Sequence, residues 1–204
     1  MLHKMKIIGI GGGSGSGKTY FTNKLIKKFP DKIDVIKLDS YYRDLSHLEF
    51  NEREENNFDH PNSFEFDLLA SNLIDLDLHG EVYIPVYDYK NHIRKKEAYT
   101  LKRKKIIIIE GIYSLYNNDI RDKMNLKLFI DTTEKIRLKR RIERDINYRG
   151  RTKESILNQY YKNVKPMHTQ LVSNTKKYAD LILKNDESNN ISFNILLDKI
   201  ISLL

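Results

Sequence analysis

One segment of the sequence has the residue types and spacing of a loop that binds nucleotide phosphates, namely GGSGSGKT at residues 12–19. Its glycines allow backbone N–H groups to turn inward around phosphate oxygens, Lys18 can reach the β- and γ-phosphates, and the Thr19 hydroxyl can bind Mg²⁺. The dinucleotide pattern G-x-G-x-x-G fits no register of these glycines, so ATP or GTP is expected rather than NAD. The candidate nucleotide-binding residues are Gly12, Gly13, Ser14, Gly15, Ser16, Gly17, Lys18, Thr19 and Tyr20.

Three acidic residues follow short apolar runs, at positions where the strands of an open α/β sheet would end. Glu110 follows four isoleucines, and a carboxylate there can bind Mg²⁺ directly or through water. Asp39 can accept or orient the proton of an attacking hydroxyl group. Each of these two could instead cap the next turn, and the spacing alone leaves both interpretations about equal. For Asp131, the following Thr-Thr-Glu favours helix capping.

The segment from Thr133 to about Tyr148 predicts a helix with two different faces. At about 100° per residue, one stripe is apolar and consists of Leu138, Ile142 and Ile146. Another face carries four arginines, namely Arg137, Arg140, Arg141 and Arg144. Their guanidinium groups repel one another unless an anion neutralises them, so we favour a segment that closes over a triphosphate, with Arg149 and Arg151 beside a hinge at Gly150. The alternative is a solvated basic helix that pairs with surface acids.

The elements expected to position these residues alternate between β-branched runs and helical patterns, which predicts an α/β fold with a parallel sheet. The expected strands are Lys6–Ile10, Asp34–Asp39, Lys105–Glu110, Leu126–Asp131 and Asp180–Lys184. Expected helices follow the first strand, span residues 64–78, and end the chain with an apolar stripe. That final stripe consists of Ile191, Ile195, Leu196, Ile200 and Leu203. The segments 80–89 and 92–101 predict a β-rich insertion.

Composition limits the classes of function. The 204 residues predict one domain, and the absence of cysteine excludes disulfides and thiolate metal sites. Of the net charge of +8, residues 90–105 and 135–153 each hold +7, so the rest of the chain is about −6. Charge concentrated in this way favours local sites for small anions over a nucleic-acid surface. The longest aliphatic run, Ile106–Ile109, is far below the roughly 20 residues of a membrane span, so no membrane partner and a cytoplasmic location are expected.

Seven further motifs follow the phosphate loop along the chain. They are LDSYYRD (38–44), NFDHPNSFEFDLL (57–69), IPVYDYKNHIR (84–94), IIIEGIYSLY (107–116), RRIERDINYRGR (140–151), QYYKNVKPMH (159–168) and TKKYAD (175–180). In this order, and from Lys6 to about Leu183, the sequence resembles the uridine kinase (uridine-cytidine kinase) family of P-loop kinases. Several ordered motifs are far more specific than a phosphate loop alone.

This resemblance implies a P-loop NTPase-like, three-layer α/β fold with a parallel five-stranded sheet. It implies one domain, residues 1–204, with a β-rich nucleoside-binding insertion at 80–102 and a helical, arginine-rich lid at 133–165. The implied reaction moves the γ-phosphoryl group of ATP or GTP to the 5′-hydroxyl of uridine or cytidine, giving UMP or CMP. Mg²⁺ is the implied cofactor, bound by Thr19 and Glu110. These small molecules are the expected partners, with no nucleic acid, and the resemblance suggests a homotetramer.

The resemblance also implies roles for single residues. Asp39 resembles the catalytic base, and Arg144 and Arg149 resemble lid arginines that approach the phosphates, so Asp39, Lys18 and Arg144 are the expected catalytic residues. Asp59 and Arg141 resemble the residues that hold the ribose hydroxyls. The residues expected to surround the base are Phe58 and Tyr89 as walls, and Tyr87, His92, Arg151 and Gln159 as readers of the pyrimidine edge.

The sequence departs from the family pattern at a few positions. Tyr20 replaces a small hydroxyl residue, Ile93 a threonine, and Asn56 a frequent basic residue, while residues 184–190 lack the usual Pro/Gly turn. Two other functions are compatible with the phosphate loop: a related kinase acting on phosphoribulose or pantothenate, and a P-loop ATPase that binds nucleic acid. FDHP and YDYKNH favour the nucleoside kinase over the first, and the concentrated charge argues against the second.

Overall fold

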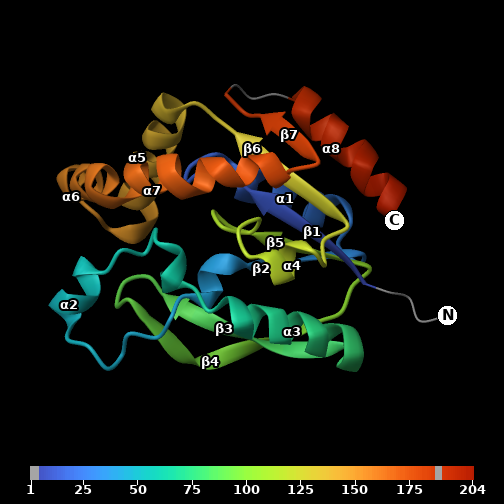
Figure 1. Ribbon diagram of the computed structural model, residues 1–204, viewed down its shortest axis with the longest axis horizontal. Helices are drawn as coiled ribbons and strands as arrows, with labels where there is room; N and C mark the ends of the chain where they lie inside the picture. Colours follow the sequence, from blue (N-terminus) through green and yellow to red (C-terminus); the bar gives the residue numbers. More distant parts are fainter. Residues whose placement is uncertain (1–4, 187–189) are drawn as a thin grey trace.

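A parallel sheet of five strands forms the middle layer of the protein (Figure 1). The computed structural model describes residues 5–186 and 190–204. The strand order is β2-β5-β1-β6-β7, and each neighbouring pair is parallel. All five predicted strands are confirmed within two residues of their predicted ends: β1 Lys6–Gly11, β2 Ile33–Lys37, β5 Ile106–Glu110, β6 Leu126–Asp131 and β7 Leu181–Lys184.

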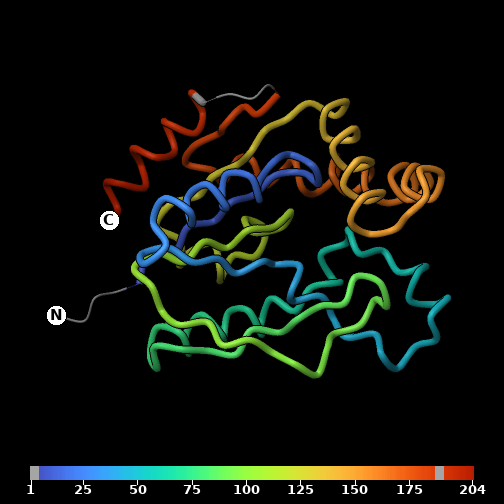
Figure 2. The backbone as a smooth tube through the Cα atoms, turned by 180° about the vertical axis from the view of Figure 1, so that it is seen from behind, coloured from blue at the N-terminus to red at the C-terminus, as the bar shows by residue number. Residues whose placement is uncertain are grey.

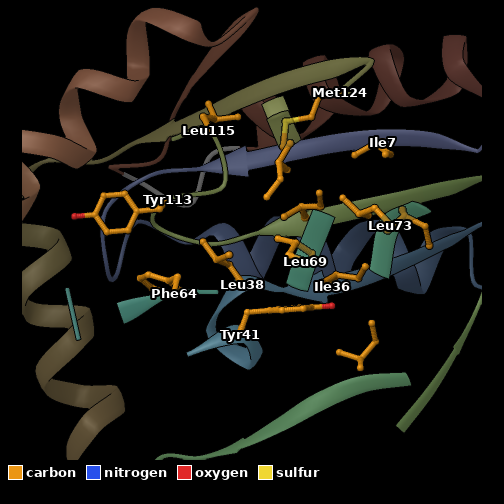
Figure 3. Packing of buried hydrophobic residues seen from close by; sticks show 14 of the residues in the cluster. Ile7, Ile36, Leu38, Tyr41, Phe64, Leu69, Leu73, Tyr113, Leu115 and Met124 are labelled. Atoms are coloured by element: carbon orange, nitrogen blue, oxygen red, sulfur yellow. The ribbon is translucent and has the colours of Figure 1, made fainter. Parts of the chain in front are cut away.

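Helices and a hairpin cover the two faces of this sheet. Ile107 and Ile109 belong to one apolar cluster and Ile106 and Ile108 to another, because successive side chains of a strand point to opposite faces. The Ile106 face packs against α1 (Lys18–Lys28) and α8 (Asn190–Leu203), and the Ile107 face against α3 (Phe66–His79). Figure 3 shows the cluster on the Ile107 face, which includes Leu69 of α3 and Ile36 of β2. The predicted three-layer α/β fold is confirmed.

The predicted β-rich insertion is an antiparallel hairpin of β3 (Glu81–Asp88) and β4 (Ile93–Lys102), separate from the main sheet. It begins after Gly80, which ends α3 at a φ of 83°. In the turn, Asp88 Oδ1 accepts hydrogen bonds from the backbone N–H groups of Lys90 and Asn91, and His92 has a φ of 55°. His92 thus adopts a left-handed backbone conformation, which is uncommon for a residue other than glycine.

Several of the remaining helices lie at one end of the molecule. Figure 2 shows residues 50–55, the hairpin turn and residues 134–165 all at that end. The α-helices here are α2 Phe50–Glu55, α5 Glu134–Arg149, α6 Lys153–Gln159 and α7 Lys165–Met167. Around α7 the chain forms π-helical turns at Tyr160–Val164 and His168–Val172 and a 3-10 turn at Ser173–Tyr178. The short helix α4, Asn118–Arg121, lies elsewhere. An ion pair of 2.8 Å between Lys162 and Glu55 joins the C-terminal helices to α2. None of the helices in the described ranges has the length and apolar character needed to cross a bilayer.

Two helical faces differ from the predicted ones. In α8, Ile191 and Ile195 are 67% and 43% exposed, whereas Phe193, Leu196 and Ile200 are buried. The helix carries apolar residues on more than one face, and only the face with the buried residues contacts the sheet. In α5, Arg137, Arg141 and Asp145 are the buried residues, and Ile146 is 43% exposed. The basic face of α5 therefore points into the protein. Residues 187–189, part of the segment that lacks a Pro/Gly turn, lie outside the described residues.

Candidate active site

The phosphate loop joins β1 to α1 and packs tightly against the start of α5. Gly12 has a φ of 137°, and a Cβ atom there would lie 2.5 Å from the carbonyl oxygen of Ile130. Gly15 has a φ of 77°, and its Cβ would clash with the carbonyl oxygen of Arg137. Both positions require glycine, because an L side chain is disfavoured at such φ values and no room exists for one. The loop is held between β6 and α5.

Lys18 lies folded over this loop. Its ammonium group is buried and donates hydrogen bonds to the carbonyl oxygens of Gly12 at 2.9 Å and Gly13 at 3.0 Å. Burial lowers the pKa of Lys18 to about 8, although the nearby carboxylates of Glu110 and Asp39 oppose the shift. An anion bound in the loop would restore the charged form of this lysine.

Thr19 and Glu110 lie next to each other, as predicted for a metal site. The Thr19 hydroxyl donates a short hydrogen bond to Glu110 Oε1, and Glu110 Oε2 is buried without a hydrogen-bond partner. A buried, unpartnered carboxylate oxygen beside a hydroxyl is a donor set that suits Mg²⁺, a hard cation that prefers oxygen ligands. No group of three or more His, Cys, Asp or Glu side chains in residues 5–186 and 190–204 could hold a metal by itself. Thr19 and Glu110 are therefore the residues of this site that would hold such an ion.

A cavity of about 300 Å³ opens beside the phosphate loop. Its walls come from segments far apart in the sequence: the ends of β1, β2 and β5, the hairpin, α2 and α5–α6. Of the predicted site residues, it brings together Ser14, Asp39, Phe58, Asp59, Tyr87, Tyr89, His92, Arg141, Arg144, Arg149, Arg151 and Gln159. Three predicted site residues do not line the cavity: Lys18 and Thr19, at the start of α1, and Glu110, at the end of β5. The Tyr20 side chain is 50% exposed and lies beside Lys24, away from the cavity.

Two carboxylates, Asp39 and Asp59, line this cavity. Asp39 lies in a 3-10 turn, Leu38–Tyr41, that directly follows β2. Asp59 is held by its backbone, since its N–H donates to Asn57 Oδ1 and its carbonyl accepts from the Tyr113 hydroxyl at 2.6 Å. Burial raises the pKa of Asp59, and the charge of Asp39 adds to the shift, against an opposing effect of Arg141. Both acids thus belong to the wall of one cavity.

Aromatic side chains form a second wall of the cavity. The rings of Phe58 and His92 are stacked, with centroids 4.8 Å apart, and Tyr42 packs edge-on against Phe58 at 5.5 Å. The Tyr87 hydroxyl is buried without a hydrogen-bond partner, although it lines the cavity. Burial lowers the pKa of His92, so its imidazole is neutral at pH 7 and carries one donor and one acceptor nitrogen. This wall combines a flat apolar surface with a few polar atoms.

Asp145 was not predicted to have a role, yet its carboxylate gathers three of the arginines. It is fully buried, and its oxygens lie 2.8 Å from Arg144, 3.5 Å from Arg149 and 3.6 Å from Arg141. Burial alone would raise the pKa of Asp145, but these arginines outweigh burial and lower it. The spacing of four residues from Arg141 to Asp145 and from Asp145 to Arg149 was the available signal in the sequence.

The arginines also connect the phosphate loop to α6. Arg141 donates to the Ser14 hydroxyl and to Gln159 Oε1, both at 2.8 Å. Arg151 donates to the same Gln159 oxygen at 2.5 Å and to Ser155. The other two arginines of the predicted face bind backbone carbonyls instead: Arg137 donates to Thr132 and Arg140 to Asn185. Only part of the predicted arginine face therefore reaches the cavity.

Comparison with known proteins shows the family of the chain. The model of the Phosphoribulokinase / Uridine kinase family matches residues 7–192. The chain is 46% identical over 204 residues to a protein from Macrococcus caseolyticus named uridine kinase, covering 100% of this chain and 99% of that protein. It is 47% identical over 199 residues to a uridine kinase of Staphylococcus haemolyticus, covering 97% and 96% of the two chains.

Solved structures with the same fold are more distant in sequence. A putative fructose transport system kinase from Silicibacter sp. TM1040 has a TM-score of 0.68 at 19% identity, covering 88% of this chain and 89% of that one. Phosphoribulokinase from Rhodobacter spheroides has a TM-score of 0.65 at 16% identity, covering 94% and 74%. These neighbours share the P-loop kinase fold, and the chain belongs to the Phosphoribulokinase / Uridine kinase family.

Proposed function

We propose that this chain is a uridine kinase, which moves the γ-phosphoryl group of ATP or GTP to the 5′-hydroxyl of uridine or cytidine and yields UMP or CMP. The observation that carries the proposal is the cavity that Asp39 and Asp59 line together with Ser14 of the phosphate loop. Relatives named uridine kinase, 44–47% identical over 97% or more of the chain, support the choice of a nucleoside as acceptor.

The transfer step follows from the position of Asp39. Its carboxylate accepts the proton of the 5′-hydroxyl as that oxygen forms a bond to the γ-phosphorus. The bond from the γ-phosphorus to the bridging oxygen breaks at the same time, and ADP leaves. Asp59 and Arg141 hold the two ribose hydroxyls, since a carboxylate accepts hydrogen bonds and a guanidinium donates them. The reacting oxygen is thereby fixed beside Asp39.

Positive groups stabilise the charge that develops on the phosphoryl group. Lys18 binds the terminal phosphates, and Arg144 and Arg149 approach them from α5. Thr19 and Glu110 would hold Mg²⁺, which would supply positive charge to neutralise the phosphate oxygens. The backbone N–H groups of residues 12–19, with the N-terminus of α1, surround the same phosphates.

The base lies against the aromatic wall. Phe58 and Tyr89 flank it, and the polar atoms of Tyr87, His92 and the Arg151–Gln159 pair face its edge. In this arrangement residues 80–102 act as the nucleoside-binding insertion and residues 133–165 as the lid of a single domain, 1–204. We also propose that the protein acts in the cytoplasm as a homo-oligomer, on the family resemblance alone.

A panel of acceptors tests this function. We expect ADP release, followed by a coupled assay, to depend on uridine or cytidine and to stay at background with adenosine, ribulose 5-phosphate and pantothenate. The result would be confirmed by the UMP or CMP formed, measured by chromatography. Stimulation by ribulose 5-phosphate or pantothenate, with neither pyrimidine nucleoside used, would instead assign the chain to a different acceptor within the same family.

The lowered pKa of Lys18 predicts how ATP binding depends on pH. Above pH 8 the free enzyme holds Lys18 largely neutral, and a bound triphosphate raises its pKa, so binding takes up a proton. ATP affinity is therefore expected to fall about tenfold for each pH unit above the free-enzyme value. Calorimetry between pH 7.5 and 9.5, in buffers of different ionisation enthalpy, measures both effects. In the Lys18→Arg variant, whose side chain stays charged, affinity should be independent of pH; a pH-independent wild type would contradict the prediction.

A further inference from the structure

Gly13 of the phosphate loop has a different reason to be glycine from its neighbours. Gly12 and Gly15 have φ values of 137° and 77°, at which an L side chain is disfavoured. Gly13 has no positive φ, so its backbone conformation alone does not require glycine. A Cβ atom at Gly13 would instead lie 2.6 Å from Arg137 Nη1, and 2.8 Å and 3.0 Å from Cδ2 and Nε2 of His168. Two side chains therefore occupy the space that a side chain at this position would need.

The guanidinium group of Arg137 is fixed in this place by its other nitrogens. The residue is 5% exposed, and its Nε donates a hydrogen bond to the carbonyl oxygen of Thr132 at 3.0 Å. Its Nη2 lies 3.5 Å from Nδ1 of His168, and because an arginine only donates, this nitrogen of the imidazole is the acceptor. Nη1, the atom nearest to the Cβ position of Gly13, is buried and has no hydrogen-bond partner among the described residues. Arg137 therefore packs against the loop through Nη1 and is held from the side by His168.

His168 reaches the phosphate loop from a distant part of the chain. It begins the π-helical turn that follows α7, and a 2.8 Å ion pair between Lys165 and Glu134 ties α7 to the first turn of α5. Burial lowers the pKa of His168 to about 4, and the charges of Arg137 and Lys18 add to the shift. The imidazole is therefore neutral at pH 7, the form in which one ring nitrogen accepts a hydrogen bond.

The next residue of the loop is held by the same helix. Arg141, one turn after Arg137 in α5, donates to the Ser14 hydroxyl at 2.8 Å. The backbone N–H groups of such a loop bind phosphate oxygens, so a loop fixed in the right shape beforehand binds a triphosphate more tightly. Neither Arg137 nor His168 lines the acceptor cavity. Their contacts with Gly13 therefore act on the side of the phosphoryl donor.

We propose that His168 is a positioning residue of the phosphate loop: it holds the guanidinium of Arg137 against Gly13 and so keeps the loop in the shape that binds the phosphates of ATP. Position 13 must lack a side chain because this contact leaves no room for one. The inference goes beyond the proposed function, in which His168 has no role, and rests on it only for ATP as the donor. The acceptor nucleoside plays no part in it.

A double-mutant cycle with ATP affinity as its readout tests this contact. Gly13→Ala is expected to weaken ATP binding about tenfold, because the added methyl group must displace Arg137 or His168. His168→Ala removes the support of Arg137 and should weaken binding about fivefold. In the double variant Arg137 can move into the space left by the imidazole, so Gly13→Ala should there cost less than about threefold. Calorimetry with ATP and no nucleoside measures all four proteins.

Two further variants separate positioning from a loss of structure. His168→Asn keeps an acceptor oxygen near the place of Nδ1 and is expected to recover most of the ATP affinity. His79→Ala removes an exposed imidazole that pairs with Asp75 on α3, and it should leave both the ATP affinity and the cost of Gly13→Ala at their wild-type values. In His168→Ala, KM for ATP should rise while KM for uridine and the melting temperature stay near the wild-type values.

Each outcome bears on the contact directly. A smaller cost of Gly13→Ala in the His168→Ala protein, with recovery in His168→Asn, supports the inference. An equal cost in both proteins, or wild-type ATP affinity in Gly13→Ala, overturns it. Affinity that falls only together with the melting temperature, without recovery in His168→Asn, also overturns it, because His168 would then support the fold alone. Wild-type protein that binds ATP but forms neither UMP nor CMP would refute the proposed acceptor and leave this inference intact.

Discussion

Replacing Asp39 with Asn is expected to reduce kcat about 10³-fold while the affinity for ATP stays near the wild-type value. An amide cannot accept the 5′-hydroxyl proton as a carboxylate does, and general-base catalysis contributes a factor of about 10²–10⁴. Asp39 lines the nucleoside cavity and makes no hydrogen bond to the phosphate loop in the described residues, so its replacement is expected to affect ATP binding only through the loss of its charge near Lys18. Single-turnover phosphoryl transfer and calorimetric ATP binding measure the two quantities separately.

A control variant comes from β2, the strand that precedes Asp39. Asp34 lies at the opposite end of β2, where it forms a 3.2 Å ion pair with Lys104 outside the cavity. Asp34→Asn removes the same charge, and its kcat is expected to stay within about twofold of wild type, since this partly exposed pair lies outside the cavity. If Asp39→Asn keeps most of the wild-type kcat, or if Asp34→Asn loses as much, Asp39 is not the base.

The fold and the phosphate loop are predictable because their signals are local. Each isoleucine of Ile106–Ile109 is buried, and such a run indicates a central strand whatever surrounds it. The loop likewise combines a strand, glycines and a helix within one short segment. The acceptor cavity differs, since its walls come from β2, the Phe58–Asp59 segment, the hairpin and α5–α6. Family resemblance, rather than spacing, predicted that Asp59, His92 and Gln159 belong to one site.

For some residues, the sequence did not predict a position in or beside the site, because that position depends on neighbouring elements of the fold. Glu54 is one acid among several in FNEREE, and only the fold places it on the cavity wall. In α5, the pattern of apolar residues predicted a two-faced helix, but it could not show that the basic face is buried. That burial is possible because Asp145 supplies a compensating charge within the helix itself. The net charge of the segment shows an excess of arginine, but it does not show that Asp145 pairs with three of these arginines.

Asp145→Asn should therefore damage both stability and phosphoryl transfer. Removing one partner from a buried ion-pair cluster leaves uncompensated charge, and a loss of about 3 kcal/mol in the free energy of unfolding is expected. The low pKa of Asp145 means that its contribution is present above the unfolded-state value of about 4 and is lost as the pH falls through the folded-state value. The difference in stability between wild type and variant should shrink as the pH falls below about 4, measured by urea unfolding.

A role in positioning the arginines predicts more than lost stability. Without the carboxylate, the guanidiniums of Arg141, Arg144 and Arg149 repel one another, and an added anion can take its place. Sulfate or ATP is therefore expected to raise the melting temperature of Asp145→Asn more than that of wild type, and Asp145→Glu should recover part of kcat. If sulfate stabilises both proteins equally and Asp145→Glu recovers only the stability, Asp145 supports the fold without placing the arginines. If sulfate raises the melting temperature of Asp145→Asn more than that of wild type, the three arginines form an anion-binding cluster. In the wild-type protein the buried Asp145 carboxylate is the anion that positions this cluster.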